Sequence, residues 1–211
     1  MGLKFLGALL FASACFAQPQ PFEIGGAIGY GVYRNGTIFG PGASAEAGIR
    51  NRFAAGFEVG EDLYEHFSGE IRYLYQDGHP FLSTSSVKSD MQGQSHAFHY
   101  DVLVHPTRRD RRLRPFLAGG VGIKGYIVAG PAPFPQALPN IATLVTHDEW
   151  KFLVTVGGGV KYRLYKNVVL RGDFLDYLTA FPRRQIAPAL NNTARGIFQQ
   201  FTPMFGVGYS F

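Results

Sequence analysis

The 211-residue chain is 46% hydrophobic, 15% aromatic and 17% charged, and its formal net charge is +5. Much of the basic excess comes from one arginine-rich stretch, so it does not indicate nucleic-acid binding. Outside the N-terminal segment no apolar run approaches the ~20 residues of a transmembrane helix, so a membrane span would have to be a closed barrel of strands. The single cysteine lies near the N-terminus, which excludes disulfides from the rest of the chain.

Residues 1–17 have the features of a cleaved secretory signal peptide. Lys4 precedes a short apolar run and then small residues, and we expect cleavage after Ala17. Residues 18–211 then form the exported domain, whose net charge falls to +4 because Lys4 is removed. Cleavage before Cys15 with lipidation of that cysteine is the alternative, although a small residue stands where lipoprotein signals usually carry a larger aliphatic one.

Alternation of apolar residues with small or polar ones predicts three strands in the first half of the chain. In residues 22–33 the large apolar side chains hold one parity and glycines dominate the other, so one face of the strand is apolar. Residues 43–60 keep a single phase from Ala47 to Val59, so we expect one long strand there rather than two joined by a turn. A third strand follows the short turn 61–67.

Five further strands follow in the second half. The clearest is 150–163, in which large apolar residues from Trp150 to Tyr162 alternate with small or charged ones. The other strands are expected at 96–105, 115–128, 168–178 and in the segment that ends at Phe211. Long polar or proline-rich loops are expected at 77–95, 129–149 and 179–195.

These elements predict an all-β fold, an eight-stranded antiparallel up-and-down transmembrane β-barrel. An even strand number is what a single-chain bacterial barrel requires, and long loops alternate with short turns as they do in such barrels. The long loops then lie outside the cell and both termini in the periplasm. The expected location is the outer membrane of a bacterium with two membranes, with outer-membrane lipid as the surrounding partner.

Charged residues within the predicted strands fall almost entirely on the face opposite the aromatic one. Acids and bases on this face are nearly balanced, and an eight-stranded barrel has room inside for side chains and little else. An Arg or Lys facing lipid at mid-depth would cost roughly 2–4 kcal/mol, so the charged face must be the interior in a membrane. We expect a salt-bridged plug rather than an open pore, built from Glu46, Arg50, Arg52, Glu58, Glu70, Arg72, Asp101, Lys124, Lys151, Lys161, Arg171 and Asp173.

The C-terminal strand alternates aromatic and small residues and ends in Phe211. It resembles the terminal strand of bacterial outer-membrane barrels, which is recognised by the barrel-assembly machinery. The resemblance implies that this machinery is a partner during biogenesis. The residues it implies as the assembly signal are Phe205, Val207, Tyr209 and Phe211.

The segment Arg114–Gly122, with Arg-Pro-aromatic and then Gly-x-Gly, resembles a strand of small outer-membrane barrel proteins. Gly158–Arg163, a short turn, and Val169–Phe174 resemble the hairpin that follows that strand. The resemblance is to the outer-membrane protein A and X type barrels and covers mainly the second half of the chain. It implies the fold and the location, but its members include anchors, adhesion factors and narrow conduits, so it implies no single activity.

Two motifs could indicate enzymatic or metal chemistry. Gly120-x-Gly122-x-x-Gly125 matches a dinucleotide-binding fingerprint, but a strand rather than a helix continues after it, so small residues in a crowded barrel explain it better. His96 and His99 are three apart and therefore lie on opposite faces of a strand, where they cannot chelate one metal ion. No cofactor is expected.

A lipid-modifying hydrolase is the enzymatic alternative, because some barrels of this size act on lipid. Its candidate residues are Ser95, His96, His99 and Asp101, near one end of the fourth strand. A nucleophile and its base would have to meet in space.

The turn between the fourth and fifth strands carries five arginines. Such runs are usually solvated, and the functional alternative is contact with anionic lipid head groups or periplasmic partners, because clustered arginines bind phosphates well. The residues of this basic turn are Arg108, Arg109, Arg111, Arg112 and Arg114.

The sequence thus favours a structural or adhesive outer-membrane protein that is not an enzyme and whose long loops contact a surface ligand. The alternative is a narrow gated conduit for small solutes through rearrangement of the charged interior. A lipid-modifying enzyme is the third hypothesis.

Overall fold

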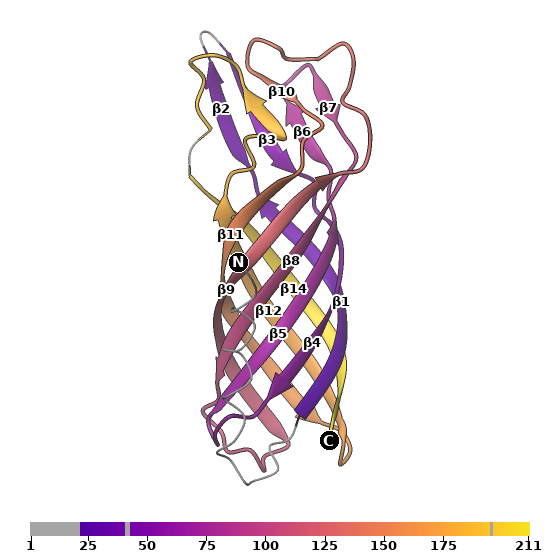
Figure 1. The fold of residues 1–211 in the computed structure, drawn as a ribbon, viewed down its shortest axis with the longest axis vertical. Helices are drawn as coiled ribbons and strands as arrows, with labels where there is room; N and C mark the ends of the chain where they lie inside the picture. Colours follow the sequence, from indigo (N-terminus) through magenta and orange to yellow (C-terminus); the bar gives the residue numbers. More distant parts are fainter. Residues whose placement is uncertain (1–21, 41–42, 195) are drawn as a thin grey trace, which may run out of the picture.

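The computed structural model describes residues 22–40, 43–194 and 196–211, so the predicted signal peptide and the alternative site at Cys15 lie outside the described residues. Eight antiparallel strands close into a barrel in the order β1-β14-β12-β11-β9-β8-β5-β4, which confirms the predicted fold class (Figure 1). They are β1 (Phe22–Arg34), β4 (Arg52–Glu61), β5 (Phe67–Asp77), β8 (Gly93–Val104), β9 (Leu113–Val128), β11 (Glu149–Arg163), β12 (Val168–Ala180) and β14 (Ile197–Ser210).

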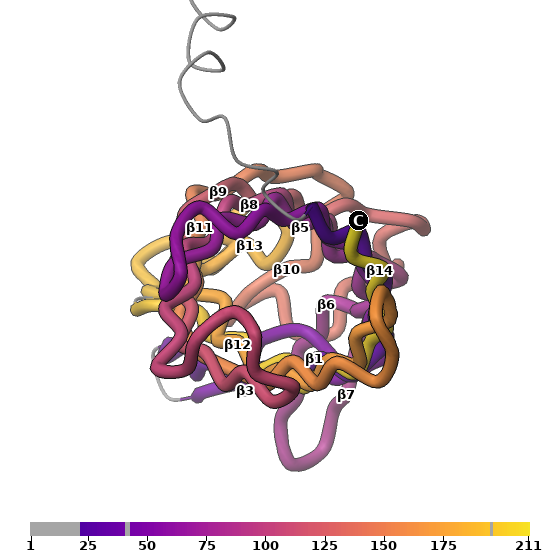
Figure 2. The backbone as a smooth tube through the Cα atoms, turned by 90° about the horizontal axis from the view of Figure 1, so that it is seen from below, coloured from indigo at the N-terminus to yellow at the C-terminus, as the bar shows by residue number. Residues whose placement is uncertain are grey.

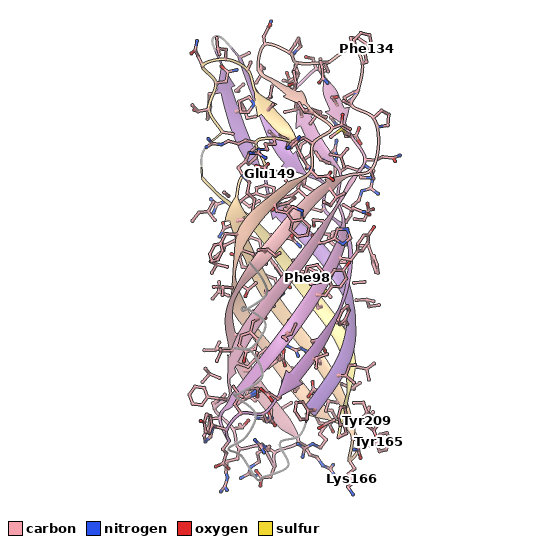
Figure 3. The ribbon with its side chains drawn as sticks, viewed as in Figure 1. Phe98, Phe134, Glu149, Tyr165, Lys166 and Tyr209 are labelled. Carbon is pink, nitrogen blue, oxygen red and sulfur yellow. The ribbon has the colours of Figure 1, made fainter. Side chains whose placement is uncertain are left out.

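The two faces of these strands differ as the alternation predicts. Large apolar side chains cover the outside of the barrel, among them Leu117, 70% exposed, and Phe205, 73% exposed. Phe98 illustrates this face at mid-height of the wall (Figure 3). The inner face carries glycine, alanine and most of the charged residues of the strands. No helix in the described part of the chain has the length and apolar character needed to cross a bilayer.

The first and last strands close the barrel. β1 and β14 pair along their length, from Glu23 opposite Ser210 to Arg34 opposite Gln199. Beyond the ladder, the backbone N–H of Phe22 donates to the carbonyl of Phe211 at 3.1 Å, and the reverse bond is 2.9 Å long. Viewed along its axis, the barrel is a closed ring (Figure 2), so the ring leaves no unpaired strand edge.

The long connections do not form open loops but a folded cap at one end of the barrel (Figure 1). A four-stranded sheet has the order β2-β3-β6-β7, and β10 pairs with β13. Residues such as Ile38, Leu82, Leu144, Ile186 and Phe198 form a hydrophobic core beneath these strands. The cap strands are β2 (Gly36–Gly40), β3 (Ala43–Ile49), β6 (Pro80–Ser83), β7 (Lys88–Asp90), β10 (Ala142–Leu144) and β13 (Ile186–Pro188). We call this end the cap end, and the opposite one, with the short connections, the turn end.

The prediction of one long strand over 43–60 is wrong. The chain breaks at Arg50 and Asn51, where the Asn51 side chain accepts the Tyr33 backbone N–H at 2.8 Å. β3 pairs with β2 and β6 in the cap, and β4 pairs with β1 and β5 in the barrel. Ile49 and Phe53 share one phase of the alternation, but they lie in different surroundings. Ile49 is buried in the cap core, whereas Phe53 is exposed on the outside of the barrel.

Candidate functional site

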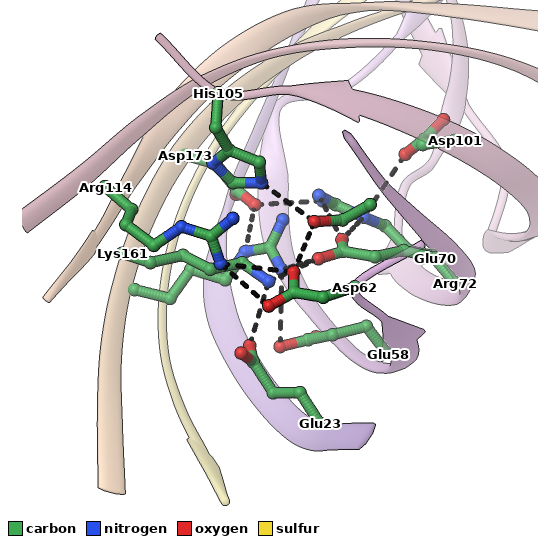
Figure 4. Close-up of polar contacts among 12 residues, drawn as sticks. Glu23, Glu58, Asp62, Glu70, Arg72, Asp101, His105, Arg114, Lys161 and Asp173 are labelled. Atoms are coloured by element: carbon green, nitrogen blue, oxygen red, sulfur yellow. Dashed lines mark hydrogen bonds and ion pairs between the residues drawn. The ribbon is translucent and has the colours of Figure 1, made fainter. Parts of the chain in front are cut away.

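Glu70 of β5 is the centre of an ion-pair network inside the barrel. One of its carboxylate oxygens accepts from Lys161 of β11 at 2.7 Å and from Arg171 of β12 at 2.8 Å. The other oxygen accepts a hydrogen bond from Arg72 Nε at 3.0 Å, and Arg72 Nη2 lies 2.9 Å from it. Lys161 also contacts Glu23 at 3.1 Å, so side chains from four strands meet at one level of the barrel (Figure 4).

Arg72 carries the network toward the cap end. Its Nη1 donates to Asp173 of β12 at 2.9 Å, and its Nε lies 3.2 Å from Asp101 of β8. Asp101 in turn lies 3.0 Å from Nδ1 of His99. All four side chains are at most 8% exposed. Charges this deeply buried must be paired to be tolerated, and ion pairs between strands on opposite sides of the barrel supply this pairing, although Arg72 Nη2 and Asp101 Oδ2 make no hydrogen bond within the described residues.

The structure brings together seven of the twelve residues expected in the plug. They are joined by Glu23 of β1, which is not one of the twelve and pairs with Lys161. Arg171 connects Glu70 to Asp173 at 2.7 Å and approaches Glu58 at 3.9 Å. The seven are Glu58, Glu70, Arg72, Asp101, Lys161, Arg171 and Asp173.

Four of the twelve are corrections, because they lie outside this network at or above the cap end. Glu46 is an exposed residue of β3 in the cap. Arg50 stacks on the ring of Phe81 at 4.4 Å. Arg52 pairs with Asp77 at 3.0 Å on the partly exposed rim, and Lys151 pairs with Glu149. Parity places a side chain on a face, but it does not say how far along the barrel axis that side chain lies.

Lys124 lies inside the barrel but has no acidic partner among the described residues. Its side chain is 1% exposed. Its Nζ donates to the hydroxyl of Tyr33 at 3.2 Å and to the Gln200 side chain. The same nitrogen lies 4.9 Å from the ring centre of Tyr33 and 5.1 Å from that of Tyr126. Lys124 therefore belongs to a polar and aromatic layer beneath the cap and not to the salt-bridged plug.

Interior glycines make room for the plug. A Cβ on Gly120 would meet Asp101, Thr155 and the backbone of Tyr100. Gly119, its neighbour, faces outward and has only one backbone oxygen at 4.0 Å from such a Cβ. The Gly120-x-Gly122 pattern thus reflects close packing in the barrel, as its alternation predicts.

In the hydrolase hypothesis His99 and Asp101 lie 3.0 Å apart, but Ser95 contacts neither histidine. Ser95 points inward and contacts Tyr33 at 3.4 Å, whereas His96 lies on the outer side and contacts Tyr73 at 2.7 Å. Ser95 and His99 share the inner face but are four residues apart, about 13 Å along the strand. Among the described residues, no three His, Asp or Glu side chains are grouped as in a metal site.

The turn end holds a second polar cluster around Asp62. Arg114 donates to Asp62 through Nη1 at 3.0 and 3.1 Å, and Ser68 donates at 2.6 Å. His105 Nε2 lies 2.9 Å from the Ser68 hydroxyl. Burial alone would raise the pKa of Asp62, but the Ser68 hydrogen bond and the Arg114 charge outweigh it and hold this pKa below its usual value. Burial, followed by the charges of Arg114 and Lys161, lowers the pKa of His105 to about 4.

The five arginines of the basic turn have different surroundings. Arg108 pairs with Glu65 at 2.6 Å on the surface, and Arg109 lies 3.3 Å from Asp62. Arg114 is 6% exposed, whereas Arg111 and Arg112 are exposed. The sequence did not predict the roles of Asp62, Ser68 and His105, because they lie in or beside turns, where no alternation marks the inner face.

The four residues inferred as the assembly signal lie where alternation placed them. Phe205, Val207, Tyr209 and Phe211 are all exposed on the outer face. The Phe211 ring stacks with Phe22 at a centroid distance of 6.2 Å. Tyr209 lies near the turn end of the barrel (Figure 3).

Solved structures with a similar fold are small outer-membrane β-barrels. OprG of Pseudomonas aeruginosa superposes with a TM-score of 0.57 at 13% identity, over 91% of this chain and 96% of that one. Neisserial surface protein A superposes with a TM-score of 0.52 at 10% sequence identity, over 90% of this chain and 97% of that one. A major outer membrane protein of Thermus thermophilus superposes with a TM-score of 0.50 at 13% sequence identity, over 90% of this chain and 99% of that one. The fold is therefore that of the small eight-stranded outer-membrane barrels.

No protein-family model and no curated protein sequence matches the chain.

Proposed function

We propose that this protein is an integral outer-membrane barrel with a structural or adhesive role, whose cap contacts a ligand at the cell surface. The observation that carries this proposal is the folded cap, which has its own hydrophobic core and stands on a barrel filled with ion pairs. A conduit needs an open path and an enzyme needs an assembled site, whereas a folded cap on a barrel filled with ion pairs suits recognition.

The outer surface of the barrel supports insertion in lipid. Its wall carries exposed aliphatic and aromatic side chains, with Tyr30 and Trp150 toward the cap end and Tyr162 and Phe211 toward the turn end. Aromatic residues at both borders of an apolar band are typical of transmembrane barrels. In this proposal outer-membrane lipid surrounds the wall, and the barrel-assembly machinery recognises the terminal strand. A purified barrel of this kind should need detergent and should migrate differently on gels before and after boiling.

The cap supports a role in recognition because it exposes apolar side chains beyond the barrel. Phe134 is 97% exposed and Leu190 is 92% exposed, and Phe134 lies at the far tip of the cap (Figure 3). Such residues contribute strongly to binding when a partner covers them.

A photo-cross-linking amino acid at Phe134 tests this role on intact cells, with the same amino acid at Lys166 in a turn at the other end as the matched control. We expect adducts with surface partners from the cap position only. Equal labelling at both positions, or none at the cap, would contradict recognition by the cap.

The charged interior favours a closed barrel over the conduit alternative. Planar-bilayer recordings of the purified protein should therefore contain no channel events, and reproducible single-channel steps would contradict this. The absence of catalysis is also part of the proposal. Mass spectra of lipid A from cells with and without the protein should be identical, and a new lipid A species would contradict it.

A further inference from the structure

A small pocket opens at the turn end of the barrel, where β9, β11 and the turn before β9 meet. Glu23, Asp62, Val169 and Ser210 also line it. The Arg163 backbone N–H donates to the Arg112 carbonyl at 2.8 Å, so the basic turn is fastened to the end of β11. The pocket brings together five basic side chains, Arg111, Arg112, Arg114, Lys161 and Arg163.

The two acids in the pocket are already neutralised. Asp62 accepts hydrogen bonds from Arg114 and Ser68 and lies 3.3 Å from Arg109. Glu23 pairs with Lys161 at 3.1 Å. Neither carboxylate therefore compensates the remaining arginines of the pocket.

Guanidinium groups that line this pocket have donors without a hydrogen-bond partner among the described residues. Arg114 is 6% exposed. It uses Nη1 for Asp62, while its Nε and Nη2 have no hydrogen-bond partner among the described residues. The Arg163 guanidinium donates to a neutral group, the carbonyl of Arg109, at 3.0 Å. The ion pairs of the basic turn use Arg108, Arg109 and Arg114, and within the described residues none uses Arg111 or Arg112.

We propose that this pocket binds a phosphate group. Arg111, Arg112 and Arg163 supply three uncompensated positive charges, and the buried Arg114 adds two nitrogens, Nε and Nη2, whose N–H groups have no partner among the described residues. A dianionic phosphate matches this charge and number of donors better than a carboxylate, which has one charge and two oxygens. Arginine forms paired, directional bonds to phosphate oxygens, and Arg114 is held in place by Asp62 before any ligand arrives.

The phosphate could come from two sources with the same chemistry. One is a soluble phosphate or phosphate ester that enters the mouth of the barrel from the aqueous side. The other is the head group of an anionic phospholipid in the leaflet beside the turn end. The second source depends on the proposed membrane location, whereas the first does not.

Isothermal titration of the protein purified in dodecyl maltoside, a detergent without phosphate, tests the site with inorganic phosphate at constant ionic strength. The double variant R111Q/R112Q removes two exposed arginines that line the pocket. R108Q/K166Q is the matched control, because Arg108 and Lys166 are exposed at the same end but do not line the pocket. Boiled and unboiled gel samples verify that each variant is folded, and the single variants R111Q and R112Q replace the double one if it does not fold.

We expect R111Q/R112Q to bind phosphate about tenfold or more weakly, since hydrogen bonds to charged groups contribute at least this factor. The control variant should bind like the wild type. Absence of phosphate binding by the wild type, or equal weakening in both variants, would overturn the site. Micelles doped with phosphatidylglycerol separate the sources: competition with phosphate assigns the site to a head group, and unchanged phosphate binding assigns it to a soluble ligand. A conducting channel in planar bilayers would contradict the proposed function without affecting this result.

Discussion

Arg72 and Asp173 join opposite walls of the barrel, with 2.9 Å between Nη1 and Oδ2. Their strands, β5 and β12, lie four positions apart in the closed ring of eight. Arg171 and Glu70 make a second contact between the same two strands at 2.8 Å. Ion pairs between opposite strands thus connect the two sides of the barrel, and these side chains lie in its interior.

Arg72→Leu should destabilise the barrel strongly, because Glu70, Asp101 and Asp173 would keep buried negative charge without this cation. We expect a loss of about 3–5 kcal/mol in the free energy of unfolding. Urea unfolding in detergent micelles measures it. Adding Asp173→Leu to Arg72→Leu should restore part of the lost unfolding free energy, because it removes one of the buried carboxylates that Arg72 no longer neutralises. A double variant less stable than either single one would contradict this account.

Lys124 and Lys161 should respond in opposite ways to replacement by methionine. Lys161 pairs with two carboxylates, so Lys161→Met should cost about 3–5 kcal/mol. Lys124 has no described acidic partner and a high cost of burial, so Lys124→Met should leave the unfolding midpoint unchanged or raise it. Equal destabilisation in both variants would indicate that the aromatic layer holds Lys124 as firmly as the carboxylates hold Lys161.

Gly120→Ala and Gly119→Ala form a matched pair of neighbours. The first adds a methyl group against Asp101, Thr155 and backbone, and overpacking of this kind typically costs about 1–3 kcal/mol. The second adds the same group to the outer face, where we expect no loss of stability. Refolding yield and urea midpoint in detergent compare the two, and similar losses in both would argue against the crowded interior.

His105 should make the barrel less stable in mild acid. Its pKa is about 4 in the folded protein and about 6.5 when unfolded. Between these values the unfolded chain binds more protons, so stability falls as the pH is lowered from about 6.5 to 4. The urea midpoint should therefore drop from pH 7 to pH 5 in the wild type. His105→Gln should show a smaller drop, and an unchanged pH dependence in this variant would exclude His105 as the cause.

The sequence alone indicated eight barrel strands and the two faces of the wall, because strand alternation is a local property, and the resemblance of its terminal strand to those of outer-membrane barrels indicated a closed barrel. The sequence also placed Glu70, Arg72, Lys161, Arg171 and Asp173 on the inner face. Only the tertiary structure decided how far along the barrel axis each charged side chain lies and which residue it contacts. That is why Glu46 and Arg50 belong to the cap, why Lys124 lies among tyrosines, and why Asp62 and Arg114 meet at the turn end. The two-residue alternation of a strand indicates on which face of the sheet a side chain lies. The contacts across the barrel depend on strand stagger and on where the chain leaves the barrel to build the cap, and both are set by pairings between distant segments.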